Sequence, residues 1–264
     1  MTDSTFDIAG RVIVVTGGLG RLGREFTKAL AGRGAKVAVL DLASDGNVEA
    51  GESVRHHRAD VTVRQDLERA LKVIEREWGP PYGLINNAGL DSPPDSAPDE
   101  NCAFESYSEK TFDRVMDVNV KGVFLCSQVF GAAMARVGAG SIVNISSIYG
   151  MVSPDQRIYD YRRKTGAAFV KPVAYSVSKS ALMNLTRYLA TYWASQGVRV
   201  NTLTLAGVEA GQDSEFVKGY TARMPIGRLA RADEYNGAVV FLCSDASAYM
   251  TGANLVIDGG WTAW

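Results

Sequence analysis

The chain has 264 residues, of which 46% are hydrophobic and 22% charged, and its formal net charge is -1. These values suit a single globular domain, because α/β domains often reach about 250 residues without dividing. The near-neutral charge gives no electrostatic footprint for a nucleic acid or an anionic membrane surface. No apolar run approaches the roughly 20 residues that cross a bilayer, so we expect no membrane partner.

Three widely spaced cysteines and two adjacent histidines add further constraints. So few cysteines predict no disulfide framework, which fits a reducing, cytoplasmic location. The histidines have no nearby cluster of ligands, so we expect no metal site. Residues 1–10 contain acids and lack the positive and apolar parts of a signal peptide.

The stretch 16–23, TGGLGRLG, follows a short apolar run at 11–15 and precedes a helical pattern through Leu30. The apolar run predicts a buried parallel strand. Glycines between a strand and a helix allow a tight turn and the close approach of a pyrophosphate to the helix start. The stretch therefore predicts a dinucleotide site.

A second strand is predicted at 36–40, and it ends at Asp41. A carboxylate at this spacing from the glycines accepts hydrogen bonds from the adenosine ribose and repels a 2′-phosphate. It favours NAD over NADP. Arg21, together with Arg55 or Arg58, keeps NADP open as the alternative.

The remaining chain continues the alternation of strands and helices. Strands are predicted at 54–59, 83–85, 140–145, 198–203 and 254–257, and helices at 62–78, 108–118, 121–135, 173–196 and 232–243. Seven strands alternating with helices indicate an α/β fold: a Rossmann-type doubly wound parallel sheet with helices on both faces. We interpret residues 1–264 as one NAD(P)-binding domain, with substrate loops at 91–108, 148–172 and 207–225.

Tyr175 and Lys179 stand four residues apart at the start of the predicted 173–196 helix, so their side chains share one face. A tyrosine ionises near pH ~10 and is a poor acid or base at neutrality. A nearby ammonium lowers that pKa, which makes proton transfer feasible. The alternative is a surface tyrosine and lysine at ordinary helical spacing.

The order of the motifs resembles the short-chain dehydrogenase/reductase family, in its single-domain branch, from Gly10 to about Trp261. The resemblance is carried by the glycine turn, Asp41, Asp60-Val61, Asn86-Asn87-Ala88-Gly89, Asn119, Ser147 and Tyr175-x-x-x-Lys179. It implies an oxidoreductase that transfers hydride between a nicotinamide and a secondary alcohol or ketone, and it also implies a homotetramer.

The resemblance further implies roles for individual residues. Tyr175 would donate or accept the proton, and Lys179 would lower its pKa and hold the nicotinamide ribose. Ser147 would bind the reacting oxygen, and Asn119 would hold a water connected to Lys179. The implied cofactor-binding residues are Gly17, Gly20, Arg21, Leu22, Asp41, Asp60, Val61, Asn87, Ala88, Gly89, Tyr175, Lys179 and Val208, and the implied substrate-binding residues are Ser147, Tyr149, Arg157 and Tyr175.

Some of these residues also have a structural interpretation. The amides of Asn86 and Asn87 follow a strand and can tie neighbouring strands together, whereas the resemblance places Asn87, with Asp60, beside the adenine. For Ser146, Asn86 and Asn144 we expect the structural role.

Segments 147–150, 156–159, 189–193 and 260–264 are also similar to oxidoreductases of bacterial surface-sugar, legionaminate-type biosynthesis. This similarity implies a sugar or sugar-derived substrate. The alternatives are a 3-oxoacyl thioester reductase of the acyl-carrier-protein type and a non-catalytic module that senses NAD.

The chain also departs from the family pattern. Arg21 replaces a glycine, Leu205-Ala206 replaces Pro-Gly, and Ser147 and Tyr175 lie 28 positions apart, further than the family usually shows. The extra residues carry cations and tyrosines that can bind phosphate, carboxylate or sugar hydroxyls. A solvated flap or a subunit contact is the other interpretation.

Overall fold

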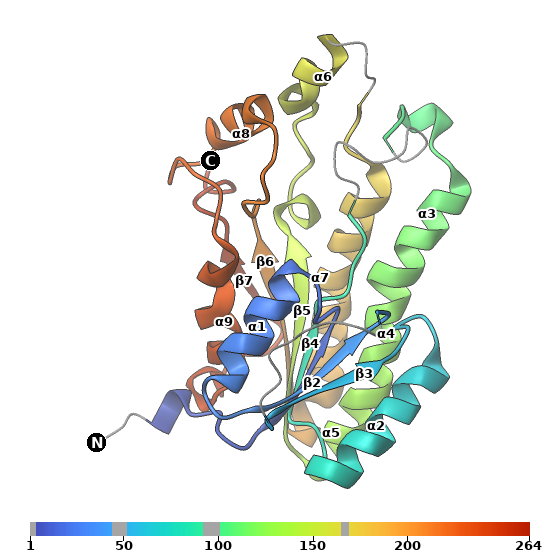
Figure 1. The fold of residues 1–264 in the computed structure, drawn as a ribbon, viewed down its shortest axis with the longest axis vertical. Helices are drawn as coiled ribbons and strands as arrows, with labels where there is room; N and C mark the ends of the chain where they lie inside the picture. Colours follow the sequence, from blue (N-terminus) through green and yellow to red (C-terminus); the bar gives the residue numbers. More distant parts are fainter. Residues whose placement is uncertain (1–3, 44–51, 92–100, 165–168) are drawn as a thin grey trace.

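The computed structural model describes residues 4–43, 52–91, 101–164 and 169–264. All seven strands form one parallel sheet in the order β3-β2-β1-β4-β5-β6-β7, which confirms the doubly wound fold (Figure 1). The strands are β1 Val12–Thr16, β2 Lys36–Asp41, β3 Val54–Arg58, β4 Gly83–Asn86, β5 Gly140–Ser147, β6 Val198–Leu205 and β7 Asn254–Ile257. The helices are α1 Arg21–Ala31, α2 Arg64–Trp78, α3 Glu109–Met116, α4 Val123–Cys126, α5 Ala132–Val137, α6 Asp160–Lys164, α7 Val173–Trp193, α8 Ser214–Thr221 and α9 Asn236–Leu242.

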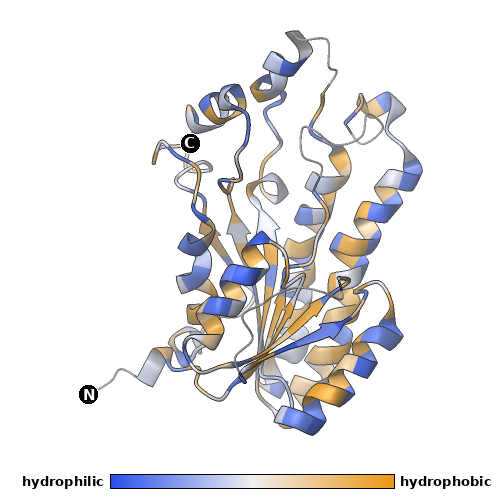
Figure 2. Cartoon of the chain, in the orientation of Figure 1, coloured by the Kyte–Doolittle hydropathy of each residue, from blue (hydrophilic) through white to orange (hydrophobic). Residues whose placement is uncertain are grey.

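The sheet is covered on both faces, and β1 shows how the sequence divides its side chains between them. Ile13 and Val15 pack with α1 and α9 on one face. Val14 packs on the other face, in the core that includes Leu67 of α2 and Trp193 of α7. Successive strand residues point to opposite faces, so an unbroken apolar run is what a sheet buried on both sides requires. Figure 2 shows these apolar strands at the centre of the molecule.

The strand order reverses beside β1, which pairs with β2 on one side and with β4 on the other. Successive strands run outward from this point in opposite directions, so the loops that follow β1 and β4 separate. Ligands of open parallel sheets bind in the resulting crevice, at the carboxyl ends of the strands. The topology therefore places the glycine turn, Asp41 and the residues after β4 around one crevice.

The two helices predicted at 108–118 and 121–135 are one continuous helical segment, Glu109–Val137. Wider, π-type turns at Asp117–Gly122 and Ser127–Gly131 join α3, α4 and α5. By length and composition this segment could cross a membrane, because its most apolar stretch of 18 residues has a mean hydropathy of 1.3. However, 61% of that stretch is buried within the fold. Its apolarity is that of a core helix packed on the sheet.

The predicted 148–172 loop is more ordered than its composition suggested. It holds a short helix at Gln156–Tyr159 and then α6. The Tyr159 ring lies 4.6 Å from that of Phe169, and both belong to an apolar cluster with Tyr220 of α8 and Trp261. In Figure 1 this segment and α8 stand together beyond the carboxyl ends of β5 and β6. The parts of the predicted substrate loops at 92–100 and 165–168 lie outside the described residues.

Candidate active site

A cavity of about 1240 Å³ lies at the carboxyl ends of the strands. It is lined by the glycine turn and Asp41 at one end and by Tyr175, Lys171 and Tyr220 at the other. Pockets for one small ligand usually measure about 300–1,000 Å³. The cavity is thus large enough for a dinucleotide and a small substrate together.

The glycine turn has the backbone that an approaching phosphate group needs. Gly17 has a φ of +60°, which favours glycine, and a Cβ there would lie 2.8 Å from the Cα of Ala88. A Cβ on Gly23 would collide with the carbonyl oxygen of Gly17. No side chain caps α1 at Gly20, so backbone N–H groups at its start are available for an anion. This cradle fits a pyrophosphate.

Asp41 lies at the end of β2 against the same turn. One carboxylate oxygen accepts a hydrogen bond from the Leu19 N–H at 3.0 Å, and the other accepts from the Ala43 N–H at 3.2 Å. These bonds orient the carboxylate, and an ionised carboxylate retains acceptor sites for ribose hydroxyls.

Arg21, Arg55 and Arg58 were the residues that left NADP as an alternative cofactor, and the structure shows where their side chains lie. Arg21 lines the cavity, but its guanidinium donates to the Glu209 carbonyl at 2.7 Å and so joins the glycine turn to the segment after β6. The Arg55 guanidinium lies 5.8 Å from the centre of the Trp78 ring. Neither Arg55 nor Arg58 is among the described residues that line the cavity.

The asparagines after β4 hold the strand ends together. The Asn87 amide donates to the carbonyls of Thr16 and Gly17 at 3.1 and 3.0 Å, which ties β4 to the glycine turn. Asn86 donates to the Asn144 side chain at 2.8 Å, and Asn144 donates to Thr186. The expected structural roles of Asn86 and Asn144 agree with these bonds. The Asn87 amide likewise uses its two hydrogen bonds to connect neighbouring segments of the backbone.

Other predicted residues of the cofactor end also lie where a cofactor could reach them. Asp60 accepts hydrogen bonds from the backbone N–H and the hydroxyl of Thr62, at 2.8 and 2.7 Å. The Val208 carbonyl accepts from Gln212 at 2.6 Å. The predicted cofactor-binding residues that line the cavity are Gly17, Gly20, Arg21, Leu22, Asp41, Asp60, Val61, Asn87, Ala88, Gly89, Tyr175, Lys179 and Val208.

Asn119 is fully buried in the π-type turn and holds the chain after β4 in place. Its carboxamide accepts from the Leu90 N–H at 2.7 Å and donates to the Leu90 carbonyl at 2.9 Å. It also donates to the Ser178 hydroxyl on α7 at 3.0 Å. Asn119 therefore links three elements of the site, and it is a positioning residue for the segment that follows Gly89.

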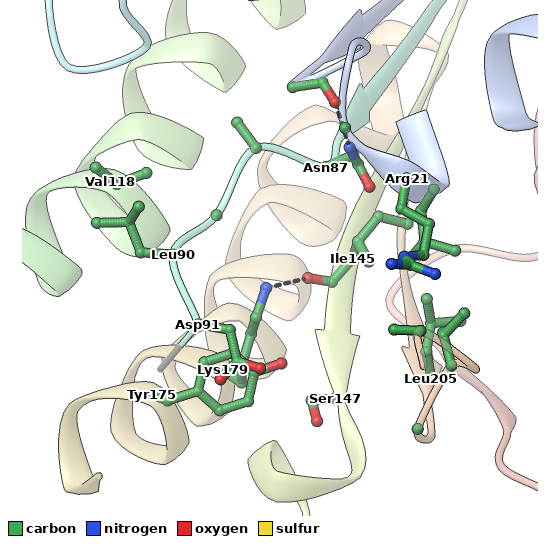
Figure 3. A pocket seen from close by; sticks show the side chains of 18 of the residues that line it. Arg21, Asn87, Leu90, Asp91, Val118, Ile145, Ser147, Tyr175, Lys179 and Leu205 are labelled. Carbon is green, nitrogen blue, oxygen red and sulfur yellow. Dashed lines mark hydrogen bonds between the residues drawn. The ribbon is translucent and has the colours of Figure 1, made fainter. Parts of the chain in front are cut away.

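Lys179 is buried, and its ammonium donates to the Ile145 carbonyl at the end of β5, at 3.0 Å (Figure 3). Pro172 adopts an extended backbone directly before α7, so the helix starts at Val173 and presents Tyr175 in its first turn. Burial lowers the pKa of Lys179 to about 8, and the Asp91 charge opposes this shift. The Lys179 ammonium lies 5.8 Å from the centre of the Tyr175 ring.

The direction of the Tyr175 pKa shift is a correction to the sequence prediction. We expected Lys179 to lower it, but burial raises the pKa of Tyr175 above its ordinary value, and the Asp91 charge raises it further. Interaction with the Ser147 hydroxyl opposes both. Desolvation of the phenolate is the largest effect, so Tyr175 is protonated at neutral pH.

Arg157 is not brought to the cavity, which is a second correction. Its side chain is 83% exposed and forms two hydrogen bonds with the Asp155 carboxylate, at 2.8 and 2.7 Å. Arg223 donates to the same carboxylate at 2.6 Å. The Arg157 guanidinium is thus paired within its own segment, and the bond from Arg223 joins that segment to the chain after α8.

The other predicted substrate residues, Ser147, Tyr149 and Tyr175, do line the cavity. The Tyr149 side chain is buried and interacts with the side chain of Tyr159.

Residues that the sequence did not single out complete the substrate end. Asp91 and Lys171 form an ion pair beside Tyr175. The Tyr220 hydroxyl accepts from the Gly207 N–H at 2.8 Å and fixes the start of the segment after β6. Lys171 was one cation among several in its segment, and Asp91 one acid among several in the 91–108 loop. No spacing joins the two, because they lie 80 residues apart.

Known dehydrogenases are similar to this chain over nearly its whole length. The family model described as Enoyl-(Acyl carrier protein) reductase matches residues 20–262. D-threitol dehydrogenase of Mycolicibacterium smegmatis is 33% identical, over 98% of this chain and 96% of its own. Galactitol 2-dehydrogenase of Rhizobium johnstonii is 34% identical, over 98% of each chain.

Two solved structures share the fold over nearly the whole chain. A short chain dehydrogenase from Leptospira borgpetersenii with bound NAD+ has a TM-score of 0.87 at 31% identity, covering 99% of this chain and 96% of that one. A gluconate 5-dehydrogenase from Burkholderia cenocepacia, in complex with NADP and tartrate, has a TM-score of 0.85 at 25% identity, with 99% and 98% covered.

The chain belongs to the short-chain dehydrogenase/reductase family. It is an oxidoreductase of the class that acts on alcohol groups with a nicotinamide cofactor.

Proposed function

We propose that this protein is an NAD-dependent dehydrogenase of a neutral polyol or sugar-derived alcohol. It oxidises a secondary hydroxyl to a ketone, or catalyses the reverse, with Tyr175 as the general acid and base. The observation that carries the proposal is the convergence of Tyr175, Lys179 and Ser147 at one end of a cavity whose other end holds the glycine turn. The relatives named for threitol and galactitol support the polyol class.

A nicotinamide held at the glycine turn and Asp41 would supply the hydride chemistry, and the chain's own groups bind the reacting oxygen and move the proton. Ser147 and Tyr175 hold the reacting oxygen between them. In the direction of ketone reduction, the Tyr175 hydroxyl donates its proton to that oxygen. In alcohol oxidation the Tyr175 phenolate removes it, and the Lys179 ammonium stabilises the phenolate.

The raised pKa of Tyr175 predicts how the two directions depend on pH. Below that pKa the phenol is protonated and ready to donate, so ketone reduction is favoured near neutrality. Alcohol oxidation needs the phenolate, so its rate increases as the pH rises above neutrality. We expect initial rates measured from pH 6 to 10 to rise with pH for alcohol oxidation and to change much less for ketone reduction, because the phenol stays protonated over this range.

NAD is the cofactor we propose, and Asp41 supports it. Its carboxylate lies against the glycine turn where an adenosine ribose would sit, and a 2′-phosphate there would meet a like charge. Two of the arginines that the sequence suggested as phosphate ligands have other partners: the Arg55 guanidinium lies at the Trp78 ring, and the Arg21 guanidinium donates to the Glu209 carbonyl.

The test is oxidation of D-threitol, galactitol and glycerol by the purified protein with NAD+ and with NADP+. Tyr175→Phe should lower turnover by about 10²- to 10⁴-fold while NADH still binds, because only the transferable proton is lost. Tyr188→Phe removes the same atom from an exposed tyrosine of α7 and is the matched control. Full turnover by Tyr175→Phe would contradict the assignment. A wild-type protein that binds NADH and oxidises no alcohol would favour the NAD-sensing module.

We also propose a cytoplasmic homotetramer, as the family resemblance implies. Tyr188 and Tyr192 support it, because they stack on the exposed face of α7 with side chains 63% and 59% accessible. Apolar side chains this exposed often mark an interface. Sedimentation as a monomer at micromolar concentration would contradict it.

A further inference from the structure

The ion pair between Lys171 and Asp91 lies at the substrate end of the cavity, directly beside Tyr175. The Lys171 ammonium donates to the Asp91 carboxylate and lies 4.7 Å from the centre of the Tyr175 ring. Both residues line the cavity. Lys171 is 7% exposed, whereas Asp91 is 53% exposed, so the pair is buried on the lysine side and accessible on the carboxylate side. Figure 3 shows Asp91 with Tyr175 and Lys179 at this end.

Lys171 is held in place by the segment that carries it. The Gln156 carboxamide accepts from the Lys171 N–H at 2.9 Å and donates to the Lys171 carbonyl at 3.2 Å. One residue earlier, the Val170 N–H donates to the Asn101 carbonyl at 2.9 Å. Phe169 is 1% exposed and packs on Tyr159. Residues 169–171 are therefore anchored on three sides.

Asp91 is held from the opposite side of the cavity. It follows Leu90, whose backbone N–H and carbonyl are both bonded to the buried Asn119 carboxamide. The extra residues before Tyr175 hold the Lys171 ammonium, and the chain after β4 holds the Asp91 carboxylate. These two supports bring the charged groups together beside Tyr175. A site of fixed donor and acceptor loses little entropy when it binds a ligand.

The chemistry of the pair selects among oxygen ligands. An ammonium donates hydrogen bonds and a carboxylate only accepts them. A single hydroxyl matches this arrangement, because it can accept a hydrogen bond from Lys171 and donate its own proton to Asp91. A substrate carboxylate matches it less well, since Asp91 already neutralises the ammonium and repels a second anion.

We propose that Lys171 and Asp91 bind the hydroxyl next to the reacting carbon, so that the enzyme selects vicinal diols and α-hydroxy ketones among neutral substrates. The proposal rests on the proposed function, which it narrows from alcohols in general to one substrate pattern. The extra residues before Tyr175 then act in substrate selection, because they supply and anchor Lys171.

The size of the selectivity follows from the same geometry. A site whose polar groups are left unpaired without the substrate hydroxyl can reject the analogue by about 10⁴-fold or more. Lys171 and Asp91 satisfy each other when the hydroxyl is missing, so the penalty is smaller. We expect kcat/KM to favour the diol by about 10- to 100-fold.

Butane-2,3-diol and butan-2-ol test this, because they differ by one hydroxyl and share the reacting group. The ratio of their kcat/KM values should favour the diol in the wild type and fall about tenfold or more in Lys171→Met and in the near-isosteric Asp91→Asn. Lys72→Met, which changes an exposed lysine of α2, should keep the wild-type ratio. Lys171→Arg, which keeps a cationic donor, should restore part of the preference lost in Lys171→Met.

Each outcome separates this inference from the function it rests on. Oxidation of neither compound, nor of any polyol, by a wild type that binds NADH would contradict the proposed function. Oxidation of both alcohols at equal kcat/KM, or a wild-type ratio in a folded Lys171→Met and a folded Asp91→Asn, would overturn the inference alone. So would a clear preference of the wild type for gluconate over galactitol. NADH titration and circular dichroism establish that each variant is folded.

Discussion

The two ends of the cavity are built in different ways. The cofactor end is made of strand ends that β-sheet pairing brings together: the glycine turn after β1, Asp41 at the end of β2 and Asn87 after β4. The substrate end is assembled from segments without regular pairing, where Lys171 meets Asp91 and Tyr220 meets Gly207. Binding of the cofactor thus depends on the sheet, whereas substrate selection depends on side chains that anchor loops.

This difference predicts that damage at the cofactor end affects every substrate alike. Gly17→Val should abolish NADH binding and lower the free energy of unfolding by about 1–3 kcal/mol, because a β-branched residue at φ +60° is strained and its Cβ meets Ala88. Titration with NADH and thermal unfolding measure the two effects. Gly138→Val is the control, since Gly138 also has a positive φ, an added Cβ there would meet nothing within 4 Å, and it is not among the described residues that line the cavity. Equal loss of NADH binding in both variants would show that backbone strain alone, without the contact to Ala88, is responsible.

The next largest effect concerns cofactor choice. Asp41→Ala removes the carboxylate that accepts from the Leu19 N–H and that would repel a 2′-phosphate. The preference for NADH over NADPH should therefore fall about tenfold or more. Dissociation constants for both cofactors, measured by fluorescence, give this ratio. Asp60→Ala also removes an acid from the cavity lining, but one that accepts from Thr62, and it should change the ratio less. A ratio unchanged by Asp41→Ala would contradict the role of this carboxylate.

At the substrate end, a change in the support of Lys171 should act on one substrate class only. Gln156→Ala removes both hydrogen bonds to the Lys171 backbone, so KM for butane-2,3-diol should rise several-fold while KM for butan-2-ol changes less. NADH affinity should stay within about twofold, because Gln156 lies outside the cofactor end. An equal rise in KM for both alcohols would mean that Gln156 has a general structural role.

The smallest expected effect is a shift of the pH profile. The Asp91 charge raises the pKa of both Tyr175 and Lys179, so Asp91→Asn should lower both. Because oxidation needs the Tyr175 phenolate, its rising limb should move to lower pH in the variant. The measurement is kcat/KM for butan-2-ol between pH 6 and 10, with Asp117→Asn, an exposed acid paired with Lys121, as the control. A shift to higher pH would contradict the assigned effect of Asp91.

Local patterns predicted most of the fold and the cofactor end. The apolar run before TGGLGRLG, the carboxylate after the second strand and the helical spacing of Tyr175 and Lys179 each combine a backbone requirement with a chemical one. Sheet pairing then brings these segments together in the order of a doubly wound fold. The structural roles of Asn86 and Asn144 follow for the same reason, because both stand on strands that pair directly.

The wrong predictions arose where long-range packing decides. Arg157 was expected at the substrate because it is a cation in the extra segment, but Asp155 and Arg223 form a network with it at the surface. The pKa of Tyr175 was expected to fall because Lys179 is four residues away, but the burial that raises it comes from the packed site as a whole. Neither a partner across the fold nor the extent of desolvation can be read from spacing.

Residue order and periodicity therefore determined the sheet, the glycine turn, the acid at the end of β2 and the helix that presents Tyr175, because these depend on neighbours within one or two elements. Only the folded chain brought Asp91 to Lys171, 80 residues away, and placed both beside Tyr175. That juxtaposition needs Asn119 to hold Leu90 and Gln156 to hold Lys171 at once. Contacts of this kind form between segments with no shared pattern, so packing alone decides them.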